Sequence, residues 1–176
     1  MLGNKRNTII ILVGILCVLL MGCKEEGPTI VELLESGEYE TAISKLEIMI
    51  EREDNVGEAY RGLGIAYWEL EEYQKARGAF EYALASGEEE TGIICNFIAV
   101  CDLRLGHIES ARQWFERGLA KENNAPELIR EMEFNQIAVY QKQGDFETAK
   151  EKLAIYVEKY PDDIEARKEA DFLETR

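Results

Sequence analysis

The chain has 176 residues, with 35 acidic and 20 basic side chains, and a formal net charge of −15. So acidic a surface repels nucleic acids and anionic lipids, which argues against a nucleic-acid partner. The sequence holds no nucleophile elbow, phosphate-binding loop or metal-ligand spacing, and its one histidine, His107, falls in an expected turn. We therefore predict that the protein is not an enzyme and that it has no cofactor, metal site or small-molecule substrate.

The N-terminus has the features of a targeting segment. Lys5 and Arg6 precede an apolar run over residues 9–21, which is shorter than the roughly 20 residues that a membrane-spanning helix needs. The run ends in Leu20-Met21-Gly22-Cys23, which resembles the lipobox of bacterial lipoproteins. An uncleaved anchor and an ordinary signal peptide with a chance cysteine are the alternatives.

The lipobox resemblance implies cleavage after Gly22 and acylation of Cys23, with palmitate among the attached chains. It places the protein outside the cytoplasm, lipid-anchored to the bacterial cell membrane or to the outer membrane. Loss of Lys5 and Arg6 with the signal peptide takes the net charge from −15 to −17. We therefore expect residues 1–22 to be a signal peptide and residues 23–28 to be the lipidated cysteine and a short tether.

Two further cysteines, Cys95 and Cys101, fall in one expected helix. Six residues along a helix separate them by about 9 Å and turn them about 120° apart. A disulfide needs Cα atoms within about 7 Å, and two thiols on different faces lack the spacing of a metal site. We predict that both are free and buried.

An internal repeat organises the rest of the chain. Four segments each contain a turn, then a large apolar residue, then an alanine three places on. The alanines are Ala42, Ala76, Ala111 and Ala149, at intervals of 34, 35 and 38 residues. The longest interval contains an Asn- and Pro-bearing stretch over residues 121–126, which indicates a longer loop.

A 34-residue helix–turn–helix unit resembles the tetratricopeptide repeat. The best copy begins at Gly57 and has the family's signature residues at Tyr60, Leu63, Gly64, Tyr67, Ala76, Phe80 and Ala83, with Glu88 in place of the terminal proline. The copies from Gly92 and Arg130 are weaker; Asp102 stands where the former should carry an aromatic residue. In the first copy the anchor shortens the first helix.

The resemblance implies an all-α, right-handed superhelical solenoid, with an irregular helical bundle as the alternative. We expect one repeat domain over residues 29–176, made of about four repeats and a C-terminal capping helix. The expected helices cover residues 29–36, 39–52, 57–70, 73–86, 91–105, 108–121, 126–143, 146–159 and 162–174.

In this family the first helices of the repeats line a concave groove. Carried over by position, the expected partner-binding residues are Arg61, Ile65, Trp68, Asn96, Val100, Leu103, Arg104, Phe134, Gln141 and Lys142, with Val31, Leu34 and Glu35 extending the line. The competing interpretation is that the apolar members pack against neighbouring helices and that Glu58, Glu69 and Glu131 pair locally with the basic ones.

We expect a membrane-anchored adaptor that binds a protein or peptide partner at the cell envelope. Two alternatives remain open at this stage. One is a structural subunit of an envelope assembly complex, and the other is a non-catalytic accessory of an envelope enzyme or transporter.

Overall fold

The structure, a computed structural model, describes residues 27–174, except the side chain of Glu174; the lipobox and Cys23 lie outside the described residues. Within that range it contains helices and no strands. The helices are α2 (Ile30–Glu35), α3 (Tyr39–Glu51), α4 (Val56–Glu69), α5 (Tyr73–Ala85), α6 (Gly92–Leu105), α7 (Ile108–Leu119), α8 (Pro126–Gln143), α9 (Phe146–Lys159) and α10 (Ile164–Glu174). Every end lies within two residues of its predicted position, and the all-α solenoid is confirmed.

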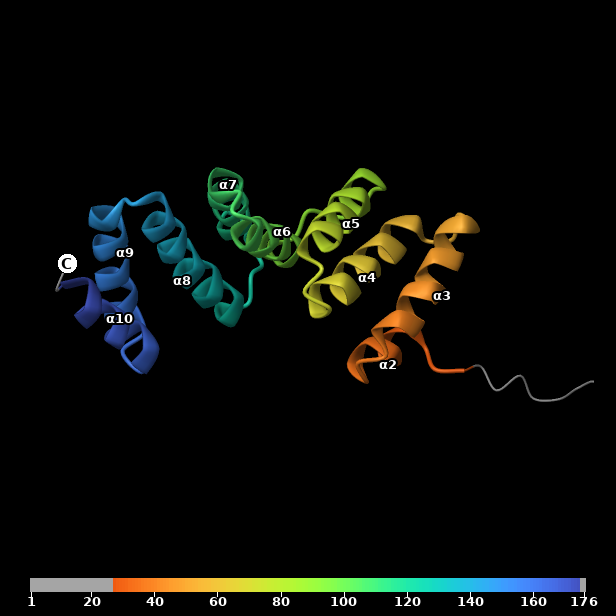
Figure 1. Cartoon of the computed structure of the whole chain (residues 1–176), viewed down its shortest axis with the longest axis horizontal. Helices are drawn as coiled ribbons and strands as arrows, with labels where there is room; N and C mark the ends of the chain where they lie inside the picture. The colour runs from red at the N-terminus through yellow and green to blue at the C-terminus, as the bar shows by residue number, and fades with distance from the viewer. Residues whose placement is uncertain (1–26, 175–176) are drawn as a thin grey trace, which may run out of the picture.

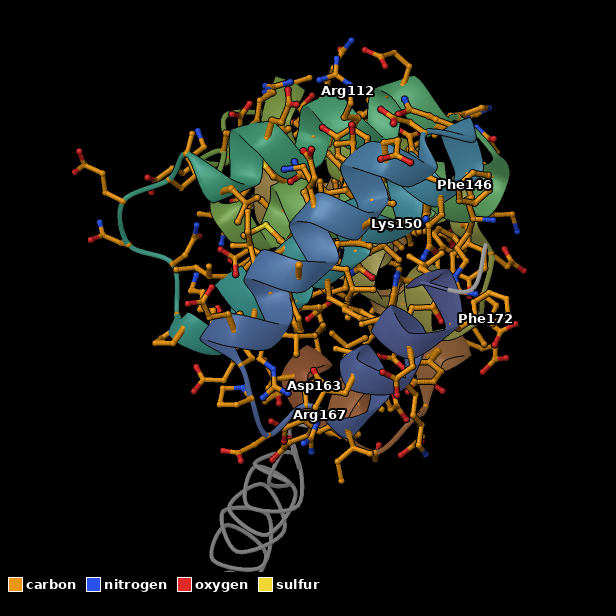
Figure 2. All side chains as sticks on the ribbon, turned by 90° about the vertical axis from the view of Figure 1, so that its left-hand side faces the viewer. Arg112, Phe146, Lys150, Asp163, Arg167 and Phe172 are labelled. Atoms are coloured by element: carbon orange, nitrogen blue, oxygen red, sulfur yellow. The ribbon has the colours of Figure 1, made fainter. Side chains whose placement is uncertain are left out.

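The helices form antiparallel pairs that follow one another along the long axis of the molecule, from α2 and α3 to α8 and α9, and α10 packs on the last pair (Figure 1). Each helix packs mainly on its neighbours in sequence, as α4 does on α3 and α5. Seen from the C-terminal end, α9 and α10 lie nearest the viewer, with Asp163 and Arg167 close together at the start of α10 (Figure 2). No helix in the described part of the chain is long and apolar enough to cross a membrane.

The tight turn inside each pair places one residue in the left-handed backbone region. That residue is Gly37, Gly106 or Gly144 in three pairs, with φ between 78° and 82°. In the second pair it is Glu71, with φ of 58°. Because only glycine adopts this conformation without a steric penalty, the positive φ of the turn explains why Gly recurs in the turn motif.

Small residues allow the two helices of a pair to approach closely. Ala76, Ala111 and Ala149, which recur in the sequence repeat, are all completely buried. A Cβ added to Gly64 of α4 would lie 2.6 Å from the ring of Phe80 in α5. The core is therefore a series of apolar clusters along the solenoid, each shared by adjacent pairs.

The predicted long loop lies between α7 and α8 and is held by one side chain. The amide of Asn124 donates to the carbonyl oxygens of Gly118, at 2.8 Å, and Lys121, at 3.1 Å, at the end of α7. The same side chain fills the space beside Gly92, where an added Cβ would be 1.8 Å from its Oδ1. The loop thus packs against the N-terminus of α6 and is held to the end of α7.

Cys95 and Cys101 are free and buried, as predicted. Burial raises the pKa of the Cys95 thiol to about 11 and that of Cys101 to about 12. Both thiols are therefore neutral at physiological pH and behave as small apolar side chains.

Candidate functional site: the concave groove

An apolar hollow of about 420 Å³ lies at the N-terminal end of the solenoid, in the predicted groove. We call it the N-terminal hollow. Its lining comes from α2, α3 and α4 and comprises Ile30, Val31, Leu34, Glu35, Leu46, Met49, Glu58, Arg61, Gly62 and Ile65. Val31 is 62% exposed although its side chain is apolar. An apolar surface left open to water in this way is typical of a binding site.

The sequence around Thr29 explains where α2 begins. The Thr29 hydroxyl accepts a hydrogen bond from the backbone N–H of Glu32 at 3.2 Å, and the Glu32 carboxylate accepts from the backbone N–H of Thr29 at 2.7 Å. This reciprocal capping box begins the helix at Ile30. With only six residues, α2 leaves part of α3 and α4 uncovered.

The charged rim of the hollow is partly neutralised within the protein. The Arg61 guanidinium lies 3.7 Å from the Glu58 carboxylate and 3.2 Å from that of Glu88, and its side chain is 40% exposed. Glu35 is exposed and forms no ion pair with any described residue. The rim as a whole is therefore acidic.

Other predicted groove residues form the seam between successive first helices. The Trp68 indole of α4 contacts the Phe97 ring of α6 edge-on, with ring centroids 5.4 Å apart. The Asn96 amide of α6 donates to the Glu131 carboxylate of α8 at 2.9 Å. The Gln141 amide of α8 donates to the Glu169 carboxylate of α10 at 2.9 Å. In this central region the predicted residues contribute to packing.

The remaining predicted residues divide between packing and exposure. Val100 and Leu103 are half-buried against the cluster that joins α6, α7 and α8. Phe134 packs on the Tyr156 ring with centroids 5.3 Å apart. The basic groups of Arg104 and Lys142 are exposed, and within residues 27–174 neither forms an ion pair. Arg104 lies over the Tyr73 ring, 5.9 Å from its centroid.

Four residues of the hollow were not expected from the sequence: Ile30, Leu46, Met49 and Gly62. Leu46 and Met49 lie on a second helix, which family position alone assigns to the core. The repeat register contained the missing signal. Once the first helix is known to be short, the residues that it would otherwise cover on α3 follow from the register.

Asp102, which stood out as a departure from the repeat, is a completely buried carboxylate. It accepts hydrogen bonds from Arg77 Nε at 2.6 Å and from Ser110 Oγ at 2.5 Å, and His107 Nδ1 lies 3.0 Å away. Ser110 and His107 both bind Asp102 and do not form a nucleophile–base pair with each other. The group is thus a structural link between α5, α6 and α7.

The described residues contain no group of three or more His, Cys, Asp or Glu side chains that could hold a metal ion. Apart from the ion pairs, the N-terminal hollow and the exposed basic groups of Arg104 and Lys142, the predicted groove residues pack against neighbouring helices. The arrangement can bind a chain segment by apolar contact and charge, and among the described residues it presents no set of groups placed for acid–base or nucleophilic chemistry.

Comparison with known proteins agrees with the repeat register. Two family models described as tetratricopeptide repeats match residues 30–92 and 133–163. Among solved structures, YrrB, described as having an unusual peptide-binding site, superposes with a TM-score of 0.70 and 23% identity, over 82% of this chain and 72% of its own. MamA from Desulfovibrio magneticus RS-1 superposes with a TM-score of 0.71 and 19% identity, over 84% of this chain and 80% of its own.

A further structure, TTC0263 from Thermus thermophilus, gives a TM-score of 0.60 and 16% identity, over 84% of this chain and 78% of its own. At these identities the likeness establishes the fold. No curated protein matches the chain.

Proposed function

We propose that this chain, which belongs to the tetratricopeptide-repeat family, is a lipid-anchored adaptor on the outer side of a bacterial membrane. It binds a protein or peptide partner on its concave face and catalyses no reaction of its own. The observation that carries the proposal is the N-terminal hollow, because a folded solenoid that leaves apolar side chains of three helices open to water has a surface suited to a partner.

The chemistry of the face supports a binding role. It combines exposed apolar groups such as Val31 with the exposed guanidinium of Arg104. Interfaces draw most of their binding energy from a few side chains, most often Trp, Tyr and Arg, in places that exclude water. The peptide-binding site named for YrrB, a protein of the same fold, is consistent with this role.

Anchoring rests on the lipobox. Only three residues separate Cys23 from Gly27, where the described structure begins. Four residue steps span at most about 14 Å. A lipid on Cys23 would therefore hold the N-terminal hollow close to the membrane surface, and the long axis of the solenoid would extend from there. At least two acyl chains are needed for stable attachment.

The binding role is tested by partner capture from envelope extract, using cross-linking and side-by-side variants. We expect Arg104→Ala to weaken capture by about thirtyfold, since a hot-spot arginine contributes about 2 kcal/mol. Lys142→Ala, which removes the other exposed basic group of the predicted groove, should weaken capture as well. Ile155→Ala, which truncates a 65% exposed side chain on α9, is the control and should leave capture unchanged. Helicity is checked for each variant. Full capture by both groove variants would refute the proposed face.

The anchor is tested separately by intact-mass measurement of the protein from the membrane fraction. We expect a mature N-terminus at Cys23 carrying a diacylglyceryl group, and an uncut precursor without lipid for Cys23→Ala. An unmodified mature N-terminus at any other residue would show that the chain is not a lipoprotein.

A further inference from the structure

We infer that the N-terminal hollow is the uncovered half of the first repeat, and that it receives a two-turn amphipathic helix with basic flanking residues from a partner protein. The inference rests on the proposed binding role and specifies the chemistry of the partner. It follows from the length of α2, from the way the chain enters it, and from the charge around the hollow.

Comparison with the complete repeats shows which surface of the first repeat is left uncovered. Helix α4 has 14 residues and α2 has six, a difference of eight residues or about 12 Å of helix. Met49 on α3 is half-buried, whereas Ala83 and Tyr156, which occupy the matching position in later repeats, are 0% and 4% exposed. In later repeats, the first two turns of the first helix cover this surface of the second helix. In the first repeat those two turns are missing, and the surface around Met49 stays open.

The chain does not cover this surface with its own described residues. The capping box at Thr29 begins α2 at Ile30, and Pro28 disfavours a helical conformation for Gly27 before it. The Lys45 ammonium also donates to the Pro28 carbonyl oxygen at 2.5 Å and so holds the incoming chain against α3. A helix in the hollow is therefore not a continuation of α2, and we assign it to another molecule, since the proposed cleavage after Gly22 leaves only four residues before Gly27.

The charge around the hollow selects a basic partner over a second copy of this chain. Residues 27–69 contain ten acidic and three basic side chains, a net charge of −7 in 43 residues, against −17 for the 154 residues that follow Gly22. The charge density of the hollow's surroundings is thus about one and a half times the average of the mature chain. A second copy would bring its own negative charge to this surface, whereas Lys and Arg would lie beside Glu35 and the exposed side of Glu58.

The shape of the hollow favours a helix over an extended strand. Its floor is built by Ile30 and Leu34 of α2, Leu46 and Met49 of α3, and Ile65 of α4, in the place where a helix lies in the other repeats. A helix with apolar residues at i, i+3 or i+4, and i+7 presents one stripe of matching length. Because the site occupies a position that this fold fills with a helix, the packing distances already suit one.

The test uses two peptide display libraries selected against the purified full-length chain. One library has a helix-favouring framework, and the other carries a central proline that prevents a helix. We expect the helical library to yield binders that carry an apolar stripe flanked by Lys or Arg. Affinities of the enriched peptides are then measured by fluorescence anisotropy.

Two matched variants locate the binding. Val31→Glu alters a side chain that is 62% exposed in the hollow, and we expect it to weaken binding at least about tenfold. Ile155→Glu makes the same kind of change at a side chain that is 65% exposed on α9, and should change affinity by less than about twofold. Both positions are open to water, so neither variant perturbs the core.

The inference is overturned if neither library yields binders, if only the proline library does, if the enriched peptides are acidic, or if Val31→Glu leaves their affinity unchanged. These results would leave the proposed adaptor role standing as long as Arg104→Ala and Lys142→Ala still weaken partner capture. Full capture by those two variants would instead remove the broader proposal.

Discussion

Gly64→Ala tests directly how closely α4 and α5 approach each other. The added Cβ would lie 2.6, 2.7 and 2.8 Å from three atoms of the Phe80 ring, well inside the usual contact distance of about 3.5–4.0 Å. The ring cannot move aside easily, since it is completely buried and stacks on Phe97 with centroids 4.9 Å apart. The pair of helices must therefore separate.

Two opposing effects set the size of the change. Overpacking a tight core costs about 1–3 kcal/mol. Replacing a glycine in a helix interior with alanine returns about 0.5–1 kcal/mol. We expect Gly64→Ala to lower the free energy of unfolding by about 1 kcal/mol, which corresponds to a fall in Tm of about 2–4 °C for a chain of this size.

Gly78→Ala is the matched control, because it makes the same substitution inside α5 with no heavy atom within 4 Å of the added Cβ. It should raise the free energy of unfolding by about 0.5–1 kcal/mol. The difference between the two variants isolates the steric cost and is measured by thermal and urea denaturation followed by far-UV circular dichroism. If Gly64→Ala stabilises the protein as much as Gly78→Ala, the close approach of α4 and α5 is wrong.

Three further predictions concern stability. Ala76→Leu and Ala111→Leu should each cost about 1–3 kcal/mol by overpacking equivalent contacts; a thermal midpoint equal to that of the parent would contradict the repeat register. Arg77→Met should cost about 3 kcal/mol, because it leaves the buried Asp102 carboxylate without its guanidinium, and Arg77→Met with Asp102→Leu should recover most of the loss in urea denaturation. If the double variant is as unstable as Arg77→Met alone, the loss of stability does not come from the unpaired charge of Asp102. The last of the three is a pH effect: the Arg130 guanidinium, with smaller contributions from the Ala166 N–H and the Tyr156 hydroxyl, lowers the pKa of Asp163 to about 2. A lowered folded-state pKa stabilises the protein above the ordinary carboxyl pKa near 4 and loses that effect toward pH 2, so the Tm gap between the parent and Asp163→Asn should narrow over this range. A constant gap would refute the pairing.

The helices could be predicted from sequence because the structural information of a solenoid is local. Each helix packs on its neighbours in sequence, so the repeated turn, large apolar residue and alanine specify both helix limits and pairing. The predicted burial of Cys101 came from its residue type, because a free cysteine behaves as a small apolar side chain. The assignment of Cys23 as the lipid anchor also came from sequence, and it stays a prediction.

Tertiary structure decided which groove residues are open and which are packed. Trp68 and Asn96 occupy family groove positions, yet one lies against Phe97 and the other donates to Glu131, because neighbouring first helices meet there. The partnership of Asp102 with Arg77 joins residues 25 apart and has no signature in the repeat. The N-terminal hollow likewise depends on how three helices pack around a missing half-helix. Sequence periodicity determined where the helices lie, whereas the exposure of each side chain depended on contacts between repeats that differ from one another.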